Sequence, residues 1–212
     1  LAYVSWWKEI TDKGFYIYTG VQRDWNGVSN VFLAQDVAMI IHSSSDTTTI
    51  TNGAAENGFT AVASFMPHNG EVGYAGNLIG GATLWLTDGL APEVEDGALT
   101  WLIWFNNTEN AAEWHQITGY IAIRKSSVEL LESQGWFDEF PNARVAGDQL
   151  AAATPSTATA GAIVGGFPAI RNEVTGAIEA ILVNNVDVTA TMTEAQTRAN
   201  NILEEYNLLN VE

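Results

Sequence analysis

The stretch from Glu109 to Tyr120 reads ENAAEWHQITGY, and it is the part of the chain that says most about the fold. The polar residues at its start predict a helix that begins at Thr108 and runs to about Ile117. Gly119 is well placed to end this helix, because glycine adopts the left-handed conformation of a helix end at little steric cost. Tyr120 then follows the helix, where it offers a ring face and a hydroxyl, although a tyrosine packed in the core is the alternative.

The segments on either side alternate between two patterns. Short apolar runs predict buried strands, and these runs are Val37–Ile41, Phe59–Phe65 and Ala82–Leu86. Helices are predicted over residues 31–38, 47–51, 98–105, 128–136 and 169–209, the last broken in two at Asn184-Asn185. Strands that alternate with helices predict an α/β fold.

The first residues have the pattern of a helix. Leu1, Val4, Trp7 and Ile10 are apolar and step by three, which suits one helix face. No run approaches the roughly 20 apolar residues of a membrane span, and the start lacks the features of a signal peptide. We therefore expect a longer protein whose N-terminal part, with its export signal, lies outside this sequence.

The composition excludes several classes of function. The 212 residues carry 8 lysines and arginines against 25 aspartates and glutamates, for a formal net charge of -17. Such a surface repels nucleic-acid phosphates and anionic lipid. The chain has no cysteine, and its three histidines, His42, His68 and His115, are too dispersed for a metal-ligand motif. We therefore predict no cofactor, no metal and no nucleic acid as a partner.

Three consecutive serines form the first candidate site. Ser43, Ser44 and Ser45 follow a predicted strand and precede a predicted helix. Such a junction presents backbone N–H groups and the positive end of the helix dipole, which together bind phosphate or carboxylate. Plain capping of the helix by a serine is the alternative.

A glycine pair and one arginine are the other candidates. Gly80-Gly81 permits close approach of a ligand or a second backbone, or else forms a tight turn. Arg171 lies in an apolar neighbourhood next to Ile170, where a guanidinium needs an anion and its planar fork suits phosphate. A structural ion pair with Glu173 or Glu179 is an equal alternative.

Three blocks in one order resemble a known family. GGATLW at residues 80–85, ENAAEWHQITGY at 109–120 and FPAIR at 167–171 resemble the C-terminal half of the extracellular solute-binding proteins of ABC importers, most closely those that bind glycerol-3-phosphate. The resemblance implies a two-lobe fold of the type II periplasmic binding proteins. It also implies a periplasmic or extracellular location, no catalysis, and delivery of the ligand to the permease subunits of an ABC transporter. Association with the membrane is expected only through that permease or through a lost lipid anchor.

The resemblance also assigns lobes and ligand residues. It implies that residues 1–76 and 124–212 belong to the C-terminal lobe, and that residues 77–123 complete an N-terminal lobe that is mostly outside this chain. The ligand would be glycerol-3-phosphate or a related glycerophosphodiester, held in the cleft between the lobes. The residues that match the family's ligand-binding positions are Ser43, Ser44, Ser45, Gly81, Tyr120 and Arg171.

Two departures and two alternatives stay open. His42 stands where a small hydroxyl residue is frequent, and Asp46 adds a negative charge near the expected phosphate. A carbohydrate is the alternative ligand, although packing in the core is the preferred interpretation of the tryptophans that could stack on a sugar, which are Trp85, Trp101, Trp104 and Trp114. A glycosidase would need two carboxylates across a cleft, and no pair stands out. An interaction module that only docks on a permease is a third reading.

Overall fold

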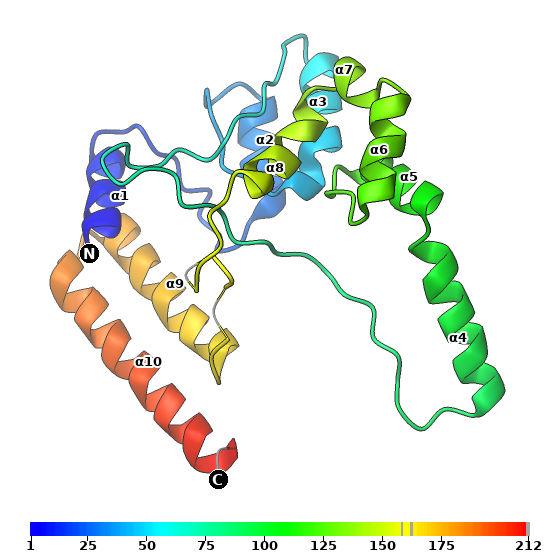
Figure 1. Ribbon diagram of the computed structural model, residues 1–212. Coiled ribbons are helices and arrows are strands. Elements are labelled where there is room, and N and C mark those ends of the chain that lie inside the picture. Colours follow the sequence, from blue (N-terminus) through cyan, green and yellow to red (C-terminus); the bar gives the residue numbers. More distant parts are fainter. Residues whose placement is uncertain (158, 162, 211–212) are drawn as a thin grey trace. The chain divides into compact units, whose positions relative to one another are not determined.

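The computed structural model describes residues 1–157, 159–161 and 163–210, and Figure 1 shows its elements. The chain divides into two compact units. Unit 1 combines Leu1–Val28 with Ala162–Glu212, and unit 2 is Ser29–Gly161. These two units are defined by contacts within the chain. The two lobes that the resemblance implies are a different division, and the boundaries of those lobes stay a prediction.

Unit 1 is built from three helices, α1 (Ala2–Asp12), α9 (Phe167–Asn184) and α10 (Val188–Asn210). Helices α9 and α10 lie side by side in opposite directions, and α1 packs on α9 (Figure 1). The buried apolar side chains of this unit are Val4, Ala177, Ile181 and Ala195. The predicted break at Asn184-Asn185 is confirmed, because Asn185 ends α9 in the left-handed conformation, with φ of 55°.

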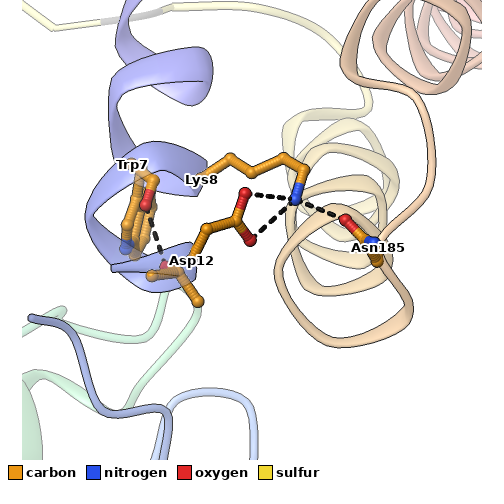
Figure 2. Close-up of polar contacts among 5 residues, drawn as sticks. Trp7, Lys8, Asp12 and Asn185 are labelled. Atoms are coloured by element: carbon orange, nitrogen blue, oxygen red, sulfur yellow. Dashed lines mark hydrogen bonds and ion pairs between the residues drawn. The ribbon is translucent and has the colours of Figure 1, made fainter. Parts of the chain in front are cut away.

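One lysine ties α1 to the turn between α9 and α10. Lys8 Nζ lies 2.8 Å from both carboxylate oxygens of Asp12, one turn along α1, and 2.5 Å from Asn185 Oδ1 (Figure 2). The ammonium group therefore holds the helix end at Asn185 as well as its own i,i+4 partner. This contact orients the first helix on α9.

Unit 2 contains the remaining helices, and most of them are short. They are the end of α2 (Trp25–Leu33), the 3₁₀ helix η1 (Ser44–Asp46), α3 (Thr47–Glu56), α4 (Pro92–Phe105), α5 (Thr108–Thr118), α6 (Lys125–Ser133), α7 (Trp136–Glu139) and α8 (Asn142–Ala151). Its buried apolar side chains are Ala54, Ala111, Ala112 and Leu131, from α3, α5 and α6. The core of unit 2 thus centres on α5, the helix that the sequence identifies most clearly.

The predicted strands are wrong for the residues that the structure describes. Val37–Ile41, Phe59–Phe65 and Ala82–Leu86 form no strand, so the α/β class is not confirmed and the described part of the chain is helical with long connecting segments. A strand needs a neighbour whose backbone completes its hydrogen bonds, and apolar β-branched residues alone do not supply one. These segments have no such neighbour in the described chain.

Side chains replace a neighbouring strand at one of these segments. Asn142 at the start of α8 accepts a hydrogen bond from Ala63 N at 2.9 Å and donates to Ala61 O at 2.8 Å. Gln149 Oε1, on the same helix, accepts from Met66 N. Because buried backbone groups must be paired, two amide side chains hold residues 61–66 extended along α8.

The expected packing of the tryptophans in the core is also wrong in the described residues. Trp85, Trp101, Trp104 and Trp114 are all exposed, and α4 has no buried residue. Figure 1 shows α4 at the end of a long connection that follows residue 75. No helix in the described ranges is both long enough and apolar enough to cross a lipid bilayer.

Candidate functional site

The serine cluster forms the start of the helical segment η1–α3. Ser43 caps η1, and its Oγ accepts hydrogen bonds from Ser45 N at 3.3 Å and from Ser45 Oγ at 3.0 Å. The three side chains are half-buried, and the Ser44 hydroxyl has no hydrogen-bond partner among the described residues. The capping interpretation therefore holds for Ser43, while Ser44 keeps its donor and its acceptor for a ligand.

Gly119 brings the end of α5 against this serine cluster. It adopts φ of 86°, and a Cβ added there would lie 2.7 Å from the carbonyl oxygen of Ser44 and 3.1 Å from Thr47 N. Only a glycine tolerates both this left-handed conformation and this proximity. Thr48 Oγ1 adds a hydrogen bond to Gln116 O at 3.4 Å. The structure therefore brings the backbone at Gly119, the residue before Tyr120, against Ser44 and Thr47.

His115 holds the backbone of Tyr120 in place. Its imidazole is buried, and Nδ1 lies 2.7 Å from Tyr120 O. Burial lowers the pKa of His115 below its ordinary value, against an opposing effect of the hydrogen bond to Tyr120. A neutral imidazole must carry its proton on Nδ1 to donate this bond. No sequence pattern assigned this contact to His115; the available signal was a histidine five residues before the tyrosine, across the glycine.

The ring of Tyr120 ends a row of aromatic side chains. Trp101 stacks on Phe105 with ring centroids 5.2 Å apart, Phe105 meets Trp114 edge-on at 5.6 Å, and Trp114 lies 6.3 Å from Tyr120. Tyr120 is 37% exposed, so it is not the core tyrosine of the alternative interpretation. Trp101, Trp114 and Tyr120 of this row are exposed.

The two departures from the family pattern form one ion pair. His42 Nδ1 lies 3.1 Å from Asp46 Oδ2, and His42 Nε2 lies 3.3 Å from Ser29 Oγ. The carboxylate of Asp46 therefore lies against this imidazole where the serines start the helix. The pattern of the sequence did not reveal this pairing.

Gly81 lies outside this arrangement. It belongs to the extended connection of unit 2, and a Cβ added there would meet no atom within 4 Å. The structure therefore does not bring Gly81 together with the serines and Tyr120.

Arg171 belongs to α9 in unit 1. Its side chain is exposed, which corrects the expectation of an apolar environment. The alternative ion pair is also wrong for the described residues, because Glu173 pairs with Arg198, and Glu179 accepts hydrogen bonds from Tyr18 and Gln22. The guanidinium of Arg171 contacts no carboxylate in the described chain and is available to an anion.

Known proteins share the sequence of this chain. A family model described as a bacterial extracellular solute-binding protein matches residues 2–144. The sn-glycerol-3-phosphate-binding periplasmic proteins UgpB of Salmonella typhimurium and Escherichia coli are each 30% identical to this chain over 208 residues. These residues are 97% of this chain and 46% of each relative, so the chain spans about half the length of the curated relatives it matches.

A crystal structure of a known protein is also similar to this chain. It is the crystal structure of UgpB from Mycobacterium tuberculosis in complex with glycerophosphocholine, with a TM-score of 0.70 and 28% sequence identity. The match covers 84% of this chain and 43% of that one. Both the matched family model and the shared fold lead to one conclusion: this chain belongs to the bacterial extracellular solute-binding protein family.

Proposed function

We propose that this chain is part of the extracytoplasmic solute-binding component of an ABC importer, which captures glycerol-3-phosphate or a related glycerophosphodiester and delivers it to a membrane permease. The protein would act in the periplasm or outside the cell and would catalyse no reaction. The observation that supports the proposal is the junction at Gly119, the residue before Tyr120, where the end of α5 lies against Ser44 and Thr47. The ligands that the relatives are named for belong to the same class.

In unit 2, the serine cluster supplies the groups that an anion needs. The Ser44 hydroxyl has no partner in the described chain, and the start of α3 adds the positive end of a helix dipole. Asp46 would repel a phosphate, but its ion pair with His42 offsets that charge. Tyr120 would then contact the glycerol part through its ring and its hydroxyl.

In unit 1, taken by itself, Arg171 is a candidate anion-binding residue. Its guanidinium fork matches two oxygens of a phosphoryl group, and no carboxylate of the described chain competes for it. Gly81 remains a candidate because its surroundings are open, which permits close approach of a ligand to the backbone.

Calorimetric titration tests the proposal directly. Glycerol-3-phosphate, glycerophosphocholine and maltose are titrated, at matched salt, into the protein that carries this sequence, produced at its natural length. We expect binding of the two phosphorylated compounds and none of maltose. Loss of phosphorylated-ligand binding in Arg171→Gln supports the assignment of the anion group. Unchanged affinity in that variant overturns it.

A carbohydrate is the second candidate ligand, and one observation favours it. Trp101, Trp114 and Tyr120 belong to one row of rings and are exposed, and flat aromatic faces bind the apolar faces of sugars. Preference for maltose in the same titration would keep the family and replace the phosphorylated ligand. Trp114→Ala would then weaken binding more than Arg171→Gln.

A further inference from the structure

The cations of this acidic chain fall into two groups. Four of the cationic side chains each contact a carboxylate in the described residues. They are Lys8, Lys13, Arg144 and Arg198. The other four, Arg23, Arg124, Lys125 and Arg171, form no ion pair there. With 25 aspartates and glutamates in the chain, a cation that contacts none of them is unusual. Two of these unpaired arginines, Arg23 and Arg171, belong to unit 1.

A hydrogen bond brings Arg23 to the same turn of α9 that carries Arg171. Arg23 Nη2 donates to Asn172 Oδ1 at 2.6 Å, and Asn172 directly follows Arg171. An amide oxygen holds the guanidinium without neutralising it, unlike a carboxylate. The structure thus places two uncompensated positive charges at one level of the helix.

The loop before Arg23 is fixed along α9 by a second set of contacts. Tyr18 Oη and the Gln22 amide both donate to the carboxylate of Glu179, eight residues beyond Arg171. These hydrogen bonds lower the pKa of Glu179 and raise that of Tyr18 to about 12. Because Glu173 is held by Arg198, neither acid of this part of α9 is left to pair with Arg23.

The backbone of Arg23 is also unusual. Its φ is 57°, in the left-handed region that a residue with a Cβ rarely adopts, and Trp25 N donates to its carbonyl at 3.0 Å. Such conformations persist where surrounding contacts impose them, and they concentrate at functional sites. Here Tyr18 and Gln22 contact Glu179 and Arg23 contacts Asn172, so the loop is held on α9 both before and at this residue.

We propose that Arg23 is a second anion-binding residue, positioned by Asn172, which acts with Arg171 on the phosphoryl group and favours a phosphomonoester over a phosphodiester. This inference rests on the proposed function. A phosphomonoester carries a charge of about -1.5 to -2 at neutral pH and has three free oxygens. A phosphodiester carries one charge and has two. A second guanidinium group, that of Arg23, therefore adds more to the binding of glycerol-3-phosphate than to the binding of glycerophosphocholine.

The test compares both ligands in five proteins of natural length, namely the wild type, R23Q, R171Q, N172A and K13Q. K13Q removes one exposed positive charge of unit 1 that already contacts Glu9, so it controls for net charge. We expect R23Q to weaken glycerol-3-phosphate binding by about tenfold and glycerophosphocholine binding by no more than about twofold. N172A should shift the preference in the same direction by a smaller factor. R171Q should weaken both ligands, and K13Q neither.

The outcomes separate the two proposals. If R23Q matches K13Q for both ligands while R171Q loses binding, the proposed function stands and the role of Arg23 is overturned. Equal losses for the two ligands in R23Q would overturn the preference for a phosphomonoester. If the wild type binds neither phosphorylated compound, the proposed function itself fails. Thermal midpoints should be unchanged in R23Q, because the side chain is exposed.

Discussion

Replacing Gly119 by alanine tests the junction on which the candidate site depends. The new Cβ would lie 2.7 Å from Ser44 O, with Thr47 N and Thr47 Cβ both at 3.1 Å. Two of these three atoms belong to the backbone, so a side-chain rotation cannot relieve the overlap. In addition, alanine is strained at φ of 86°, by about 1–2 kcal/mol. The overlap adds about 1–3 kcal/mol, as other insertions into packed sites do.

Gly135→Ala is the matched control. Gly135 has φ of 70° in the same unit, and a Cβ there would meet no atom within 4 Å. The control thus has the backbone strain without the overlap, and it should lower the free energy of unfolding by about 1–2 kcal/mol. Gly119→Ala should lower it by about 2 kcal/mol more, which for a chain of this size is roughly 4–8 °C in Tm.

Two assays read the result. Thermal unfolding followed by circular dichroism compares the two variants, and calorimetry compares their affinities for glycerol-3-phosphate. We expect only Gly119→Ala to weaken binding, because only that overlap displaces the end of α5 from Ser44. Equal destabilisation by the two variants would refute the close approach of α5 to Ser44. Equal affinity would refute the role of this junction in the site.

Three further predictions concern single side chains. Burial lowers the pKa of His115 in the folded protein, so the unfolded chain binds this proton first as the pH falls. The stability that depends on a neutral His115 is therefore present above the ordinary value of 6.5 and is lost as the pH falls below it. H115Q should remove that part of the pH dependence of urea unfolding. Asn142→Ala should cost about 1–3 kcal/mol of stability and speed proteolysis within residues 59–66, because Ala61 O and Ala63 N lose their partner, and an unchanged cleavage pattern would contradict this. Removing the negative charge in Asp46→Asn should tighten glycerol-3-phosphate binding, whereas His42→Gln should weaken it, as titration will test.

Local patterns predicted the elements whose hydrogen bonds close within one segment. The helix that starts at Thr108 and stops at Gly119 is confirmed, as is the break at Asn184-Asn185. Capping by Ser43 was one of the stated alternatives, and it is formed. A helix and its caps depend on residues a few positions apart, so the chain itself contains the information.

Strands and buried aromatic side chains were predicted less well for the same reason. The runs at Val37–Ile41 and Ala82–Leu86 have a strand composition, but a strand forms only against a partner, and none is present in the described residues. Trp101 and Trp104 were expected in the core, yet no residue of α4 is buried and both side chains are exposed. Composition predicts what a segment suits, and it does not supply the neighbour.

The sequence by itself determined the family, through three ordered blocks, and it determined the candidate residues and their chemistry, through hydroxyls, a tyrosine and an arginine. Only the tertiary structure decided which of them meet. It placed Ser44 against Gly119, joined His42 to Asp46, and left Arg171 without a carboxylate. Such contacts join residues that are distant along the chain or, for His42 and Asp46, one helical turn apart. Their formation depends on how helices pack, which no local pattern records.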